Sequence, residues 1–179
     1  FRVSVGLRSG VRDTVGEKVG RKIEGELGIP GVSVRIVKTY SIEGLDQAEV
    51  DRAVERAALH DPVLHVVSTG PVAEGFDWLL EVGFRPGVTD NEGRTAAETL
   101  AVALGLDNGR AEQVKVFTAT QYLLSADPAR PLDRDAVERI GGGLLANGLI
   151  QRWDIRSAEE FAADPLGPRA ARVTGRADD

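Results

Sequence analysis

Apolar and polar residues alternate along 1–7 and again along about 78–84, and this alternation predicts a β-strand in each place. Each strand is followed by a turn that contains glycine, Ser9-Gly10 in the first case and Pro86-Gly87 in the second. After each turn, apolar residues recur about every four positions, which predicts an amphipathic helix. The residues expected to face the core are Val15, Val19, Ile23 and Leu27 in the first helix, and Ala96, Leu100 and Leu104 in the second.

Local capping signals predict where these helices begin and end. Thr14 and Glu17 have the spacing of a capping box, in which each side chain satisfies a free amide at the start of a helix. Gly28 and Gly105 stand where the two apolar stripes stop, and glycine commonly follows the last helical residue.

Each stretch then continues with the same kinds of element. A second strand is expected over 32–40 and over 114–124, and a last strand over 63–68 and over 149–155. Between them a second helix is expected, marked by Val50, Val54 and Ala57 in the first stretch and by Val137, Ile140 and Leu144 in the other. The order β-α-β-α-β is therefore predicted twice.

The two stretches also match residue by residue. Residues 5–16 align with 82–93 at an offset of 77, and seven of these twelve pairs are identical. The register holds through the first helix, and after a short insertion the offset becomes 82, which pairs Tyr40 with Tyr122. We interpret the chain as a tandem duplication.

The predicted fold is α+β: a small βαβαβ unit built twice, with a sheet whose helices pack on one face, forming a pseudo-dimer. The first repeat is assigned to 1–75 and the second to 76–160. A unit of about three strands is too small to be very stable alone. Two copies can either extend one sheet or pack helix against helix, and the sequence leaves both arrangements open.

The two ends of the chain suggest a longer polypeptide. The sequence starts with Phe1 and contains no methionine. From Asp164 onward the apolar periodicity is lost among proline, glycine, arginine and aspartate. Residues 161–179 are therefore expected to be a linker toward a downstream domain.

Composition narrows the class of protein. A formal net charge of −6 and a pI near 5.1 argue against binding to nucleic acid or to an anionic membrane. No run of about 18 apolar residues occurs. The absence of cysteine excludes disulfides, thiolate metal sites and cysteine nucleophiles. We expect a soluble, cytoplasmic protein that binds neither nucleic acid nor a membrane.

No motif for catalysis or metal binding is evident in the sequence. His60 and His65 are the only histidines, fewer than the three or four ligands that a metal site needs. No nucleophile-elbow pattern surrounds a serine, and the glycine clusters match neither a phosphate loop nor a dinucleotide fingerprint. Close helix packing, or a break in the helix, is the better interpretation of Gly141-Gly142-Gly143. We predict no catalytic residue and no metal site.

The best polar candidate is the segment 85–94, which leaves a strand and enters a helix. Its free helix amides could hold an anion, although it could equally be an ordinary turn with Asp90 or Asn91 as N-cap. Arg8, Asp13 and Gly16 occupy the equivalent places in the first repeat, which favours a structural need there. Because other positions differ, a specialised function is expected on the second copy. The candidates in this segment are Arg85, Thr89, Asp90, Asn91 and Arg94.

The run 144–153, Leu-Leu-Ala-Asn-Gly-Leu-Ile-Gln-Arg-Trp, resembles a family signature. It is similar to Leu-Leu-Ala-Asn-Pro-x-Ile-Glu-x-Tyr of the PurS-type small subunit of phosphoribosylformylglycinamidine synthase. Residues 58–64 carry a weaker version, and Arg85-Pro86-Gly87 with the helix after it looks like the duplicated amino-terminal domain of the fused form. Gly148 stands where the family prefers proline and Gln151 where it prefers glutamate. The resemblance covers about 1–155 and adds Asn147 to the candidate residues.

The resemblance implies a role in purine synthesis. The whole enzyme converts formylglycinamide ribonucleotide to the amidine, using ATP with magnesium and ammonia released from glutamine. It implies that this segment is not an enzyme by itself and holds no cofactor. Instead it joins a PurL-type ligase domain to a PurQ-type glutaminase, with the candidate residues at an interface or at the edge of the substrate site. The alternative is a tandem amino-acid-sensing (ACT-like) regulatory module, which would lack the Leu-Leu-Ala-Asn signature.

Overall fold

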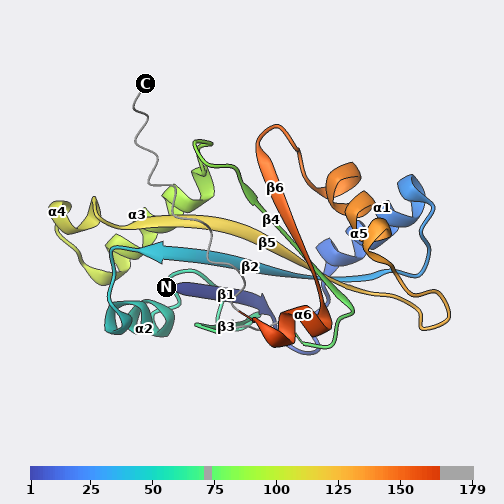
Figure 1. Ribbon diagram of the computed structural model, residues 1–179. Helices are drawn as coiled ribbons and strands as arrows, with labels where there is room; N and C mark the ends of the chain where they lie inside the picture. Colours follow the sequence, from blue (N-terminus) through green and yellow to red (C-terminus); the bar gives the residue numbers. More distant parts are fainter. Residues whose placement is uncertain (71–73, 166–179) are drawn as a thin grey trace, which may run out of the picture.

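The computed structural model describes residues 1–70 and 74–165 (Figure 1). In these residues, six strands form one antiparallel sheet in the order β3-β1-β2-β5-β4-β6. The strands are β1 (Arg2–Leu7), β2 (Ser33–Glu43), β3 (His65–Ser68), β4 (Trp78–Phe84), β5 (Lys115–Ser125) and β6 (Gln151–Ser157). The helices are α1 (Thr14–Leu27), α2 (Gln47–Glu55), α3 (Asn91–Leu104), α4 (Asn108–Ala111), α5 (Arg134–Ile140), a π-helical turn η1 (Gly141–Leu145) and α6 (Ala158–Ala163). The predicted α+β class is confirmed.

The two stretches that match in sequence join by extending one sheet. The strands β2 and β5 pair along their whole length, from Ser33 opposite Ser125 to Glu43 opposite Lys115. Figure 1 shows these two long strands crossing the molecule side by side. Outward from this central pair, each side carries the first and then the third strand of its own stretch. Of the two arrangements that the sequence left open, the sheet extension is the one observed.

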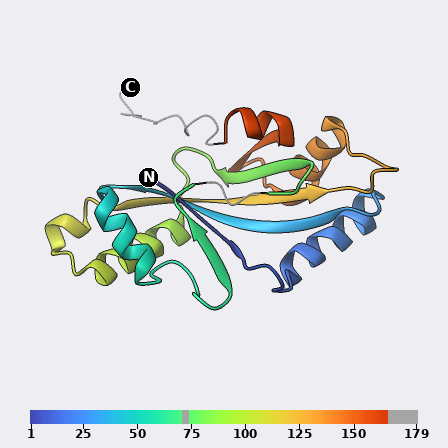
Figure 2. The ribbon, with the colours of Figure 1, turned by 90° about the horizontal axis from the view of Figure 1, so that it is seen from below.

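Two of the three apolar cores in the described residues lie under the long helices, and each draws residues from both stretches. In one core α2 and α3 pack together, so that Val50 and Ala53 meet Leu100. In the other core α1 and α5 pack together, so that Ile23 meets Val137. Figures 1 and 2 show the two helix pairs at opposite ends of the long strands. Because apolar burial is shared in this way, the first helix of each stretch depends on the other stretch for its partner.

The N-cap of α1 lies one residue earlier than the sequence suggested. Asp13, not Thr14, is the N-cap of α1, and its side chain accepts a hydrogen bond from the Gly16 amide at 2.7 Å. The predicted Thr14–Glu17 capping box is therefore wrong, as is the burial of Val15, which is 59% exposed. The left-handed C-caps are confirmed: Gly28 and Gly105 both have φ of +67°.

A short helix covers the opposite face of the sheet. Ser157 begins α6 with a capping box, and Phe161 packs on Val37, Leu79 and Leu123. The prediction that helices pack on one face only is thus wrong for α6, and the predicted linker begins too early, since 161–163 are helical. The predicted linker residues 166–179 lie outside the described residues.

The other element boundaries shift by three residues or less, the largest shift being the end of β2, at Glu43 where residue 40 was expected. The strands β3 and β6 begin two residues later than expected, because tight turns hold the residues before them. The helix α2 ends at Glu55, so that Ala57 lies beyond it in a left-handed conformation with φ of +54°. The glycine run is confirmed as both a helix break and a close contact: it forms η1, and Gly141 and Gly142 face Trp153.

His60 borders a small apolar space between α2, α3 and the sheet. The space holds about 10 Å³ and is lined by apolar side chains such as Val3, Ile42 and Leu100. The buried Nδ1 of His60 has no hydrogen-bond partner within the described residues. Burial, followed by the nearby His65, lowers the pKa of His60 below its ordinary value of 6.5, while Asp61 opposes the shift.

The half-buried imidazole of His60 is expected to make the stability of the protein fall on mild acidification. Because the folded-state pKa of His60 is lowered, its contribution is fully present above pH 6.5 and is lost as the pH falls from that value through the folded pKa. The carboxylates with shifted pKa values, Glu17, Glu49 and Glu160, have theirs lowered from 4.5 and so titrate below this window. Urea unfolding midpoints measured between pH 8 and pH 5 should decline, and the decline should be smaller in His60→Leu. Equal slopes in both proteins would contradict this assignment.

Candidate functional site

The segment 85–94 connects β4 to α3, and the structure places it beside the turn at 147–151. The backbone amide of Arg85 donates to the Ile150 carbonyl at 2.9 Å, and its Nε donates to the Gln151 carbonyl at 3.0 Å. The Val88 amide closes the turn by donating to the Arg85 carbonyl at 3.1 Å. Arg85 and Asn147, which are far apart in the sequence, therefore belong to one surface.

Asn147 builds the turn that carries the family-like signature. Its Oδ1 accepts a hydrogen bond from the Leu149 amide at 3.0 Å, and the Gln151 Oε1 accepts one from the Asn147 amide at 2.8 Å. Such a pair of side-chain bonds closes the backbone without a regular ladder. The turn leaves Leu149 and Ile150 86% and 42% exposed. The structure thus gives Asn147 and Gln151 a definite role in backbone conformation.

The first stretch contains the same turn at 61–65. Asp61 Oδ1 accepts from the Val63 amide at 2.7 Å, and His65 Nδ1 accepts from the Asp61 amide at 3.0 Å. Arg8 reaches this turn as Arg85 reaches the other, donating through Nη2 to the Pro62 carbonyl at 3.0 Å. His65 therefore fulfils the role of Gln151.

Asp90 joins the start of α3 to the middle of the sheet. Its carboxylate accepts hydrogen bonds from the Gly93 amide at 2.7 Å, from the Thr118 amide at 2.6 Å and from the Thr118 hydroxyl. In the first stretch Asp13 likewise bonds the Gly16 and Ile36 amides, at 2.7 and 2.8 Å. Of the two interpretations offered by the sequence, the N-cap is the one that Asp90 fulfils.

The electrostatics at the start of α3 are unfavourable for a bound anion. Asp90 already occupies one of the amides, and Glu92 stands in the first turn, where it pairs with Lys38 at 2.6 Å. Burial, followed by the charge of Glu92, raises the pKa of Tyr40. Thr89, Asn91 and Arg94 are exposed. These three side chains are free to meet a partner.

Replacing Asn147 by alanine should destabilise the protein by about 1 kcal/mol, because the Leu149 amide loses its acceptor and the turn loses its preferred conformation. Asn91→Ala should change stability by less than about 0.5 kcal/mol, since its side chain is exposed at the start of α3. Chemical unfolding followed by circular dichroism compares the two. Equal effects would show that the Asn147 turn contributes nothing specific.

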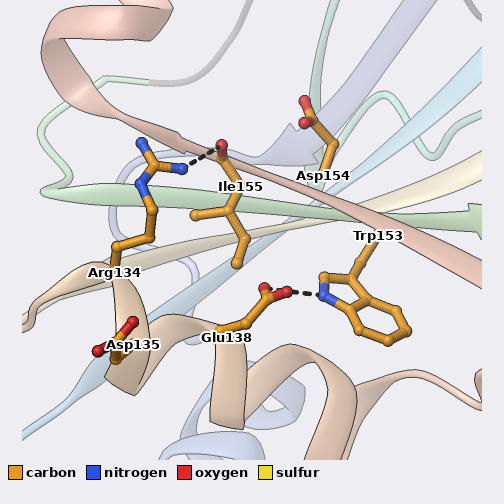
Figure 3. Close-up of a pocket in the computed structure, with 6 residues that line it drawn as sticks. All are labelled: Arg134, Asp135, Glu138, Trp153, Asp154 and Ile155. Atoms are coloured by element: carbon orange, nitrogen blue, oxygen red, sulfur yellow. Dashed lines mark hydrogen bonds between the residues drawn. The ribbon is translucent and has the colours of Figure 1, made fainter.

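A pocket in the described residues lies elsewhere, between α5 and β6. It has a volume of about 350 Å³, and Figure 3 shows the side chains around it. Its lining consists of Arg134, Asp135, Glu138, Trp153, Asp154 and Ile155. The sequence analysis did not predict this pocket. One signal for it was present, since the glycine run 141–143 precedes Trp153, the aromatic residue that ends the signature.

Within residues 1–70 and 74–165, no cluster of three or more histidine or acidic side chains is arranged to hold a metal ion. In the same residues, no helix has the length and apolar character needed to cross a membrane. Comparison of the chain with protein-family models and with curated proteins finds no match.

Proposed function

We propose that this chain is a PurS-like, duplicated assembly domain of phosphoribosylformylglycinamidine synthase. The observation that carries the proposal is the turn at 147–151, whose sequence resembles the family signature and whose hydrogen bonds recur at 61–65. A signature that sets a backbone conformation explains why Gln151 can stand in place of glutamate: both offer an acceptor to the Asn147 amide.

The interpretation as a duplicated unit is supported by devices that repeat at equivalent positions. The caps Asp13 and Asp90 each tie a helix to the following strand, and both helices end in a left-handed glycine. The strand order reads the same from either end of the sheet. These features support a pseudo-dimer of two βαβαβ units that share one sheet.

In this proposal the domain contributes no group to the chemistry. ATP and magnesium would be bound by the PurL-type ligase domain, and ammonia would be released by the PurQ-type glutaminase. The surface formed by the 85–94 segment and the 147–151 turn would meet one of these partners. Its exposed Leu149 and Ile150 offer apolar area, and Arg85 and Arg94 offer positive charge.

An add-back assay tests the proposal. The synthase lacking 1–179 is assayed for amidine formation with glutamine and with ammonium, with and without the separate domain. We expect the domain to restore glutamine-dependent turnover. Full activity of the truncated enzyme with both nitrogen sources, unchanged by the domain, would contradict the proposal.

A matched pair of variants locates the surface. Arg85→Ala should lower glutamine-dependent activity in the add-back assay, whereas Arg8→Ala, which removes the equivalent side chain of the first stretch, should not. Both variants lose a similar hydrogen bond to a carbonyl, so a difference between them reflects the partner and not the fold. Equal activities would remove the 85–94 segment from the interface.

The alternative of a tandem amino-acid sensor is tested separately. Such a module would bind an amino acid without any synthase component, and ligand binding to the folded state would raise the Tm. A clear thermal shift with an amino acid alone would favour the sensor over the assembly domain.

A further inference from the structure

The pocket between α5 and β6 is held open by two pairs of groups. On one side the indole nitrogen of Trp153 donates to Glu138 Oε2 at 3.0 Å, and on the other Arg134 Nη1 donates to the Ile155 carbonyl at 3.2 Å. Figure 3 shows the space between these two pairs, with the second carboxylate oxygen of Glu138 turned toward it. The pocket therefore presents an acceptor and an aromatic ring to an incoming group.

The fold itself does not require this arrangement. Trp153 lies opposite Val82, and in the first stretch the equivalent partner of Val5 is Val67. A valine there leaves only the small apolar space beside His60, about 10 Å³ in volume. The second stretch thus has a pocket of about 350 Å³ where the first has a space of about 10 Å³.

The helix beside the pocket is altered to accommodate the indole. A Cβ on Gly142 would come within 2.8 Å of the Trp153 ring, and one on Gly141 within 3.0 Å. Each glycine costs about 1 kcal/mol relative to alanine in a helix, and the π-helical turn there is of a kind frequent at functional sites. The two glycines therefore leave room for the Trp153 ring at a cost in helix propensity.

The charges of the pocket select a cationic group. Arg134 is neutralised by Glu160, which it contacts through two bonds of 2.7 Å, and Asp154 pairs with Arg156 at 3.3 Å. Asp135 and Glu138 have no ion-pair partner within the described residues. Glu138 beside the indole, with Asp135 farther along α5, complements a guanidinium, which can pair with carboxylate and interact with the ring.

The neighbouring strand edge accommodates an extended chain. Among the described strands β6 is terminal, so that one of its edges has no strand partner. Side chains already bind two of its main-chain groups, Arg134 at the Ile155 carbonyl and Glu160 at the Ser157 amide, so an added segment would pair mainly around Trp153. An extended segment can add to such an edge through main-chain hydrogen bonds while one side chain enters an adjacent pocket. We propose that the Trp153 pocket receives an arginine side chain from an extended segment of a partner protein. This inference does not depend on the resemblance to the synthase.

The chain has only two tryptophans, which provides a direct test. In ¹H–¹⁵N spectra of the isolated domain, a Trp78→Phe variant assigns the indole signal of Trp153. Titration with acetyl-Val-Arg-Val-amide should move the Trp153 signal to saturation and leave that of Trp78 in place. The matched peptide acetyl-Val-Glu-Val-amide should move neither.

Substitutions then distinguish binding in the pocket from nonspecific attraction to the acidic surface of the protein. Glu138→Gln keeps an acceptor for the indole and should weaken binding of the arginine peptide roughly fivefold, as should Asp135→Asn. Glu98→Gln, on an exposed position of α3, should leave the affinity unchanged. No movement of the Trp153 signal at about 10 mM peptide, or equal affinity in all three variants, would overturn the inference. Because the test uses no synthase activity, its failure is distinct from failure of the proposed function.

Discussion

Replacing Gly93 by alanine is expected to destabilise the protein by about 3 kcal/mol or more, which corresponds to a fall in Tm of roughly 6–12 °C. Gly93 lies in the first turn of α3, where the helix rests directly on β5. An added Cβ would lie closer than 3.0 Å both to the Val116 carbonyl oxygen and to the carboxylate of Asp90. Neither atom can move easily, because one belongs to a central strand and the other caps the helix.

The same overlap is present at Gly16, whose added Cβ would meet the Val34 carbonyl and Asp13. Gly16→Ala should therefore destabilise the protein to a similar extent. The matched control is Gly25→Ala in the same helix, where nothing lies within 4 Å and alanine should stabilise by up to about 1 kcal/mol. Urea unfolding measures all three. A Gly93→Ala protein as stable as the wild type would show that α3 does not rest on β5 as described.

Some parts of the fold could be predicted from the sequence alone. Period-two alternation located β1 and β4 within one residue, because Val3 and Val5 of β1, like Leu80 and Val82 of β4, alternate toward the cores under the helices. The ends of α1 and α3 at Gly28 and Gly105 were also predicted, since these glycines act through local backbone conformation alone, which the structure shows to be left-handed. Signals of short range were sufficient for these elements.

Features that depend on distant residues were missed. Asp13 and Thr14 are both capping residues by type, and Asp13 is favoured because its carboxylate also binds the Ile36 amide in the next strand. The helix α6 has six residues, and its position depends on Phe161 meeting the edge of Phe76, with ring centroids 5.4 Å apart. A pattern read along the chain contains neither contact.

The candidate site likewise has parts that the sequence predicted and parts that it did not. The segment 85–94 was recognised as a strand-to-helix connection, and the structure brings Arg85 to the Asn147 turn, which no spacing in the sequence indicated. The Trp153 pocket was missed because Glu138 and Trp153 lie on different elements whose relative placement follows from the sheet order. Candidate residues chosen by type alone, such as Asp90, have a structural role as well.

The substitution Asp90→Ala is expected to destabilise the protein by about 2–4 kcal/mol. The lost N-cap accounts for about 1 kcal/mol, and the Thr118 amide and hydroxyl, buried in the middle of β5, lose their acceptor. Asp13→Ala should cost about 1 kcal/mol less, because Ile36 offers only its amide to that carboxylate. Asp90→Asn should fall between wild type and Asp90→Ala, since its amide group retains one acceptor oxygen.

A matched control distinguishes this role from ordinary capping. Asp107 caps the short helix α4 through the Arg110 amide at 2.9 Å and binds no strand, so Asp107→Ala should cost only about 1 kcal/mol. Chemical unfolding gives the ranking, and hydrogen exchange of the Thr118 amide gives the mechanism, because that amide should lose protection in Asp90→Ala alone. Equal costs for Asp90→Ala and Asp107→Ala, with Thr118 still protected, would show that Asp90 acts only as a helix cap. Asp90 would then again be available for a role at the partner surface, because the central strand would not need its carboxylate.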